Sequence, residues 1–206
     1  NPMRQDIEEI GQKMGIHYTV GTILNEEKQV LKAFFGEPKA VMQAAIPTIR
    51  QMFTVPVSAP YDLVIASPGG YPKDINLYQA QKGLTHAARI TRDNGTVILL
   101  AGCEEGSGSP SYETYITQMA SHQDVIDHFK GGFFKVGPHK AYQIAKDAQR
   151  VTVILVSEIP PETVLEWKLT PSQPDKLDAL LDWLTTQLPA NARVAILPAA
   201  TRTMTE

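Results

Sequence analysis

The sequence predicts an α/β protein in which a parallel sheet is flanked by helices, preceded by a small α+β piece. From about residue 60 onward, short apolar runs typical of strands buried on both faces alternate with helical patterns. This alternation indicates βαβ units and a Rossmann-like sheet. A segment containing Pro56 and Pro60 separates this part from the residues before it, which show no such alternation. We therefore place a domain boundary there, dividing the chain into residues 1–57 and 58–206.

The residues before the boundary are predicted to contain a helix, a two-stranded hairpin and a second helix. These elements are expected at residues 4–14, 17–24, 29–35 and 39–52. In the first helix, Ile7, Ile10 and Met14 recur at the spacing of one helix face. The polar residues 25–28 are expected to form the hairpin turn. Pro47 is expected to interrupt the second helix, because proline has no amide hydrogen to donate.

The residues after the boundary are predicted to supply the sheet and its covering helices. Apolar runs expected to form strands lie at residues 62–67, 96–101, 151–157 and 193–198. The longer helical patterns cover residues 76–92 and 175–188. Shorter helices are expected between the second and third strands, and one of them begins near Gly137 and Pro138.

Composition and charge exclude several classes of protein. Hydrophobic residues make up 43% and charged residues 20% of the 206 residues, which fits a globular chain and argues against disorder. The net charge of −3 shows no basic excess, so we expect no nucleic-acid partner. No apolar run is long enough for a membrane span, and the first residues show no signal-peptide pattern. The lone cysteine, Cys103, cannot form a disulfide within the chain, so we expect a reducing, cytoplasmic location.

Two glycine-rich loops are candidate ligand sites, because ligands of open α/β sheets bind beyond the carboxyl ends of the strands. That rule selects residues 67–74, residues 101–108 and the loop beginning at Ser157. Neither glycine-rich loop contains G-x-G-x-x-G or G-x-x-x-x-G-K-S/T, so a standard dinucleotide or P-loop site is disfavoured. Gly69 and Gly70 would let backbone amides approach an anion. The alternative is that the pair only forms a tight turn between strand and helix.

The helix predicted after the first loop carries polar side chains on one face. Tyr78 and Gln79 lie about one turn before Lys82, which lies one turn before His86. A lysine supplies charge, and an amide and a phenol orient a ligand by hydrogen bonds, so the set suits a carboxylate. The alternative is an ordinary solvated polar face.

Other residues able to carry chemistry give weaker indications. Cys103 has no adjacent histidine to lower its pKa, so we expect an unreactive thiol. His122 and His128 are six residues apart, a poor spacing for one metal ion. His139 opens a predicted helix, where it either contacts a ligand or is a capping or surface residue. Neither a catalytic residue set nor a metal site can be identified from spacing.

The string from Asp62 to Gly83, DLVIASPGGYPKDINLYQAQKG, resembles the C-terminal domain of the nickel-pincer-nucleotide lactate racemase family. The loop GCEEGSG at residues 102–108 and the opening of the chain, including TILN at residues 22–25, are similar to the same family. The resemblance covers most of the chain. Its specific part is the pattern G-G-Y-P-x-D-x-N-x-Y-Q-A-x-K, whereas the Gly/Ser loop alone would not be specific.

The resemblance implies an isomerase that racemises or epimerises lactate-type 2-hydroxy acids by reversible hydride transfer. Its cofactor would be a nickel pincer nucleotide made from nicotinic acid adenine dinucleotide and tethered to a lysine of an N-terminal domain. The C-terminal domain would close over the site, with Gln79 and Lys82 binding the substrate and Tyr78 beside them. We include His139 among the candidate substrate-binding residues. Gly69 and Gly70 are the candidate cofactor-binding residues.

The sequence departs from the family pattern in one respect. The resemblance implies that the family's histidines, tethering lysine and metal ligand belong to segments upstream of Asn1 and Pro2, so none of them is in this sequence. We therefore interpret residues 1–57 as the tail of an N-terminal domain and residues 58–206 as the substrate-clamping domain. Its partner would be the missing N-terminal domain. The chain alone is expected to be inactive and to expose apolar residues around Ile16–Phe35. Alternatives are a larger 2-hydroxy acid as substrate, or a non-catalytic ligand-binding module.

Overall fold

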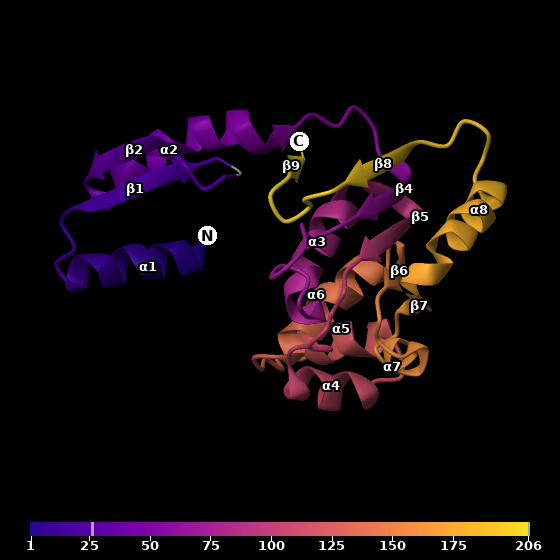
Figure 1. Ribbon diagram of the computed structural model, residues 1–206. Coiled ribbons are helices and arrows are strands. Elements are labelled where there is room, and N and C mark those ends of the chain that lie inside the picture. Colours follow the sequence, from indigo (N-terminus) through magenta and orange to yellow (C-terminus); the bar gives the residue numbers. More distant parts are fainter. Residues whose placement is uncertain (26, 206) are drawn as a thin grey trace. The chain divides into compact units, whose positions relative to one another are not determined.

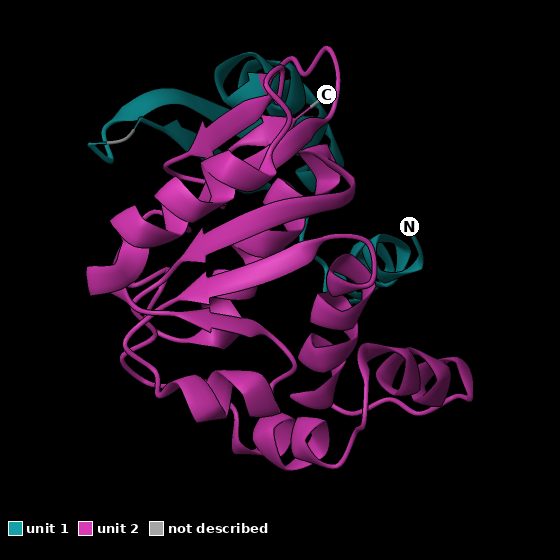
Figure 2. Cartoon of the chain, turned by 90° about the vertical axis from the view of Figure 1, so that its right-hand side faces the viewer, with its two compact units in different colours: residues 1–54 teal, residues 55–206 magenta. Residues whose placement is uncertain are grey.

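The computed structural model describes residues 1–25 and 27–205 (Figure 1). Glu26, which belongs to the predicted hairpin turn, lies outside the described residues. The chain divides into two compact units, Asn1–Thr54 and Val55–Glu206 (Figure 2). We call them unit 1 and unit 2 and describe each by itself.

Unit 1 contains the predicted helix, hairpin and second helix. Their bounds are α1 Pro2–Lys13, β1 Thr19–Leu24, β2 Val30–Gly36 and α2 Pro38–Phe53. The two strands pair antiparallel, and Val41 of α2 packs on the hairpin at Gly21, where an added Cβ would lie 2.9 Å from a methyl carbon of Val41. The expected interruption at Pro47 is wrong, since α2 continues through it. Because Pro47 has no amide hydrogen, the carbonyl oxygen of Gln43 lacks its usual helical partner. Both residues are exposed, so water can hydrate that oxygen.

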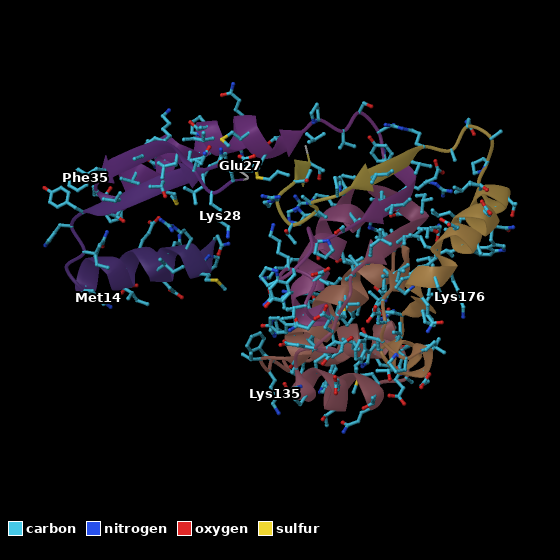
Figure 3. The ribbon with its side chains drawn as sticks, in the orientation of Figure 1. Met14, Glu27, Lys28, Phe35, Lys135 and Lys176 are labelled. Atoms are coloured by element: carbon cyan, nitrogen blue, oxygen red, sulfur yellow. The ribbon has the colours of Figure 1, made fainter. Side chains whose placement is uncertain are left out.

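Unit 1 exposes most of its large apolar side chains. Among its described residues, only Ile23 and Val41 are buried hydrophobic residues. Phe35, labelled in Figure 3, is 73% exposed. Its ring stacks on that of Tyr18, with centroids 5.6 Å apart. Exposed apolar residues of the hairpin region are Ile16, Tyr18, Val20, Leu24, Val30, Leu31 and Phe35. This exposure was expected around Ile16–Phe35, and a surface of this kind is typical of regions that contact other protein.

Unit 2 contains a parallel sheet of five strands within the described residues, which confirms the predicted α/β fold class. The strands are β4 Tyr61–Ala66, β5 Thr91–Leu100, β6 Thr152–Val156, β7 Thr170–Ser172 and β8 Val194–Leu197, in the order β7-β6-β5-β4-β8. Strand β7 was not predicted, because its residues Thr-Pro-Ser form no apolar run. Two short strands, β3 Thr54–Val55 and β9 Met204–Thr205, lie outside this sheet.

Helices cover both faces of the sheet (Figure 1). The helices of unit 2 are α3 Leu77–Ile90, α4 Pro110–Thr117, α5 His122–Lys130, α6 Pro138–Ala148, α7 Pro161–Glu166 and α8 Leu177–Gln187, with a 3₁₀ turn at Pro174–Lys176. Alternate strand residues face opposite sides. Val64 and Val97 therefore join the core that contains Leu84 of α3, whereas Leu63 joins a smaller cluster with Leu184 of α8. None of the described helices is long and apolar enough to cross a membrane.

The strand order places a topological switch point between β4 and β8. From β4 the chain adds β5, β6 and β7 in one direction, then returns through α8 to pair β8 with the other side of β4. The loops that follow β4 and β8 are joined by hydrogen bonds, from the Ala200 amide to the Ser67 carbonyl (2.8 Å) and from Thr201 Oγ1 to the Pro68 carbonyl (2.7 Å). Ligands of such sheets bind at the switch point. This position therefore brings residues 198–203, which the sequence did not indicate, beside the first glycine loop.

Candidate ligand-binding site

The first turn of α3 has its backbone amides occupied by protein groups. Asn76 is the N-cap residue, and its side-chain oxygen accepts from the Gln79 amide at 3.1 Å. The Leu77 and Tyr78 amides donate to the carbonyls of Gly106 and Ser107, each at 3.0 Å. These are the groups that a helix N-terminus would otherwise offer to an anion. An anionic ligand at α3 must therefore be bound by side chains.

The second glycine loop, residues 102–108, supports the start of α3. The Cys103 amide donates to the Asp74 carbonyl at 2.8 Å, and Asn76 Nδ2 donates to Glu105 Oε2 at 3.3 Å. Gly108 has a φ of +71°, and a Cβ at this position would lie 2.4 Å from Asn76 Cγ. Only glycine fits this close approach. The loop therefore positions the N-cap of the helix that carries Gln79 and Lys82.

The first glycine loop contains the candidate cofactor-binding residues at the switch point. Gly69 and Gly70 have φ values of +110° and +70°, so both positions favour glycine, as a tight turn requires. A Cβ on Gly69 would meet the side chain of Lys73 at 3.4 Å and Ala199 at 3.7 Å. A Cβ on Gly70 would have no neighbour within 4 Å. The tight turn alone is enough to explain both glycines. The open side of Gly70 also leaves room for a ligand, and cofactor binding at this loop stays a prediction.

Gln79 and Lys82 are brought together on the exposed face of α3. Lys82 Nζ donates to Gln79 Oε1 at 2.7 Å. This hydrogen bond uses the amide oxygen and leaves the Gln79 NH2 group beside the ammonium group, so two kinds of donor are presented side by side. A carboxylate, which only accepts hydrogen bonds, matches such a pair. We call Gln79 and Lys82 the clamp pair.

Tyr78 and His139 meet across α3 and α6. Their rings make an edge-on contact with centroids 5.8 Å apart. His139 Nδ1 accepts from the Gly137 amide at 3.1 Å, so the hydrogen of the neutral ring is on Nε2. Burial, and then the charge of Lys140, lower the pKa of His139. A neutral imidazole with an Nε2 donor therefore lies beside the phenol ring.

Lys140 is a component of this site that the sequence did not indicate. It is only 8% exposed, and its Nζ donates to Gln81 Oε1 at 3.1 Å and to Gln143 Oε1 at 3.0 Å. The same ammonium group lies 4.7 Å from the centroid of the Tyr78 ring, within range of a cation–π contact. Burial, and then the charge of Lys82, lower the pKa of Lys140. A lysine in a helix is usually solvated, and no feature of its local sequence marked it as buried.

A cavity of about 400 Å³ opens between α3 and α6, within the ~300–1,000 Å³ typical of ligand pockets. Its charged or polar lining includes Lys82, His86, Lys140, Gln143, Lys146 and Asp147. His86 is fixed by a hydrogen bond of 2.7 Å between its Nδ1 and the Thr203 carbonyl, so Nδ1 carries the hydrogen. The cavity thus begins at Lys82 of the clamp pair and extends along both helices.

His122 and His128 lie outside this site. Burial, and then the charge of Lys168, lower the pKa of His122. His128 stacks on Phe133 with centroids 4.3 Å apart and hydrogen-bonds the Tyr115 hydroxyl at 3.1 Å, so it belongs to an aromatic cluster. Among residues 1–25 and 27–205, no group of three or more His, Cys, Asp or Glu residues could hold a metal ion.

Cys103 is expected to resist alkylation while the protein is folded. The side chain is 2% exposed, and burial, followed by the charge of Asp74, raises the pKa of the thiol to about 12. Because the thiolate is the reactive form, a thiol reagent at pH 8 should modify it only after the chain unfolds. The measurement is the rate of labelling with and without denaturant. Rapid labelling of the native chain would contradict the buried position.

Comparisons with known proteins agree with the predicted fold and with the family that the sequence resembles. The family model described as the lactate racemase C-terminal domain matches residues 57–202. Lactate racemase from Lactiplantibacillus plantarum is 26% identical and that from Thermoanaerobacterium thermosaccharolyticum is 28% identical, each over 127 residues and 62% of this chain. Each match spans 30% of the length of the relative.

Solved structures show the same fold. The lactate racemase apoprotein from Thermoanaerobacterium thermosaccharolyticum matches 100% of this chain and 50% of its own, with a TM-score of 0.90 and 22% identity. A protein from Thermotoga maritima matches 92% of this chain and 48% of its own, with a TM-score of 0.63 and 14% identity. The chain thus spans about half the length of the solved structures that it matches.

Proposed function

The chain belongs to the lactate racemase C-terminal domain family, and from this we propose that it is the substrate-clamping part of a racemase or epimerase acting on 2-hydroxy acids. The observation that carries the proposal is the clamp pair, in which Lys82 Nζ lies 2.7 Å from Gln79 Oε1 on an exposed helix face. A 2-hydroxy acid carries a permanent carboxylate. An ammonium and an amide NH2 group side by side can bind it with one charge-assisted and one neutral hydrogen bond.

The neighbouring residues would orient the remainder of the acid. Tyr78 supplies a hydroxyl donor and acceptor, and His139 supplies an Nε2 donor, so both can reach polar groups near C2 of the substrate. Holding the acid by its carboxylate leaves C2 free to react on either face. Since proximity and orientation supply much of the barrier reduction in such reactions, this positioning is the contribution that the chain's own residues make.

We further propose that the complete protein uses the nickel pincer nucleotide of the family that the sequence resembles. Its chemistry when bound would be to take up the C2 hydride of the substrate and return it. The described residues do not form a nickel site, because they contain no group of three or more suitable ligands. The metal would therefore be held by a preceding domain of which residues 1–57 form the tail. Gly69 and Gly70, at the switch point, would allow the nucleotide to approach this chain closely.

The chain of residues 1–206 alone is expected neither to bind nickel tightly nor to racemise lactate, because it lacks a ligand group for the metal. Metal analysis after dialysis and a chiral lactate assay would measure both properties. The full-length protein, loaded with its cofactor and given a panel of chiral 2-hydroxy acids, is the positive control. Stoichiometric nickel with ligands inside residues 1–206 would contradict the cofactor assignment. An inactive full-length protein that nonetheless binds hydroxy acids would instead favour a ligand-binding module.

A larger 2-hydroxy acid is favoured over lactate by one observation. The cavity of about 400 Å³ that begins at Lys82 continues past Lys140 toward Lys146, which is more room than a three-carbon acid needs.

A further inference from the structure

The cavity between α3 and α6 has an excess of positive charge. Lys82, Lys140 and Lys146 line it, with His86, and Asp147 is the acidic residue of its lining. Asp147 accepts a hydrogen bond of 2.8 Å from Thr85 Oγ1, and burial raises the pKa of its carboxyl group. This carboxylate therefore accepts from a neutral hydroxyl and forms no direct ion pair with any of the three lysines among the described residues, while the charge of Lys146 acts on it from a longer range.

Lys140 is the group whose charge most needs a partner. Its Nζ is surrounded by two amide oxygens and the face of Tyr78, and within the described parts of the chain no carboxylate lies within ion-pair distance of it. Burying a charge without an opposite charge is costly, and a second ammonium group nearby adds repulsion. Lys82, which lowers the pKa of Lys140, supplies that repulsion.

Neutral groups link Lys140 to Asp147 without bringing their charges together. Gln81 Oε1 accepts from Lys140, Gln81 Nε2 donates to Thr85 Oγ1 at 2.7 Å, and Thr85 Oγ1 donates to Asp147. This chain of hydrogen bonds fixes the orientation of the Gln81 amide and holds the Lys140 ammonium at the cavity wall. Such a fixed, unneutralised cation is preorganised for an anion, because little side-chain freedom remains to be lost on binding.

We propose that this cavity is a subsite for a second anionic group of the substrate, a carboxylate or phosphate at the end opposite to C1, bound by Lys140 with Lys146 at the far side. The clamp pair would hold the C1 carboxylate, so in this respect the inference rests on the proposed function. The substrate class is then a dianionic 2-hydroxy acid. A ligand with only one carboxylate would leave Lys140 without a counter-charge, which is why it should bind more weakly.

Titration of the ¹⁵N-labelled chain with four probes tests the subsite, at constant ionic strength because exposed charges are screened. The probes are L-lactate, L-malate, 3-phospho-D-glycerate and inorganic phosphate. We expect malate or phosphoglycerate to bind at least about tenfold more tightly than lactate, with shifts at Gln79–Lys82 and at Lys140–Lys146. Inorganic phosphate distinguishes a free phosphate ion from the phosphate group of an organic acid. If it shifts signals at Lys140–Lys146 alone, the subsite recognises the anion itself.

The variant Lys140→Met should abolish the preference for dianions over lactate, since methionine keeps the apolar contacts of the lysine stem but carries no charge. Lys135→Met is the matched control, because Lys135 is an exposed lysine of the same unit whose loss removes the same charge (Figure 3). Should Lys140→Met fail to fold, Lys146→Met at the exposed rim of the cavity is expected to weaken dianion binding several-fold.

The outcomes separate the subsite from the proposed function. Equal affinity for lactate and the dianions, an unchanged preference in both cavity variants, or binding of neither kind of acid would overturn the subsite. Lactate binding at the clamp pair without a dianion preference would leave the proposed function standing. Dianion shifts confined to Lys140–Lys146, with none at the clamp pair, would support the anion subsite and contradict the clamp.

Discussion

Replacing Lys82 by alanine in the full-length protein is expected to lower racemisation on the order of 10²-fold or more, taking a lost charge-assisted contact as roughly 3 kcal/mol. The ammonium group is half of the clamp pair, and among the described residues its side-chain hydrogen bond goes to Gln79 Oε1 at 2.7 Å. Without it, the substrate carboxylate loses its charged partner, and C2 is no longer held in place for reaction. A chiral assay on purified enzyme measures the effect.

The same substitution should leave stability nearly unchanged. Lys82 is exposed on α3 and forms no ion pair among the described residues, so its replacement should change the free energy of unfolding by no more than about 0.5 kcal/mol. Lys130→Ala, at an exposed site in the last turn of α5, is the matched control and should keep full activity. Full activity in Lys82→Ala would remove the clamp. Lost activity accompanied by unfolding would make the lysine structural.

The fold could be predicted from sequence wherever one local pattern decided the structure. The apolar runs that became β4, β5, β6 and β8 are such cases, because strands of a parallel sheet are buried on both faces. Strand β7 is Thr170–Ser172 and forms through pairing with β6, a contact that its own residues do not reveal. Pro47 shows the opposite error. A strong local rule was overridden because the helix turn that lacks its hydrogen bond faces solvent.

Among the candidate residues, spacing along one helix places Tyr78, Gln79 and Lys82 together on α3, whereas His139 of α6 could be named from the sequence but not placed beside them. Lys140 comes from α6, and its burial depends on α3 packing against α6, so its own sequence neighbourhood gives no signal. The loop after β8 could not be recognised either. Its place beside Gly69 follows from the return of the chain to the far side of β4, which is a property of the strand order.

Replacing Gly108 by alanine is expected to destabilise unit 2 by about 3 kcal/mol, combining left-handed backbone strain with loss of a helix cap. Gly108 has a φ of +71°, and its new Cβ would lie 2.4 Å from Asn76 Cγ, so the N-cap side chain must move. The hydrogen bond of 3.1 Å that the Gln79 amide donates to the Asn76 side chain is then lost. Both tryptophans, Trp167 and Trp183, belong to unit 2, so tryptophan fluorescence during chemical denaturation reports its unfolding.

Gly70→Ala is the matched control, because Gly70 has a φ of +70° but no atom within 4 Å of the added Cβ. It should therefore show the backbone strain alone, about 1 kcal/mol. Hydrogen exchange of the Leu77, Tyr78 and Gln79 amides should accelerate in Gly108→Ala and not in Gly70→Ala, since only the first variant displaces the cap. Equal destabilisation by both variants would mean that the left-handed backbone conformation, and not the contact with Asn76, determines the loss in free energy of unfolding. A larger cost at Gly108 would show that the second glycine loop holds the start of α3, one turn from the clamp pair.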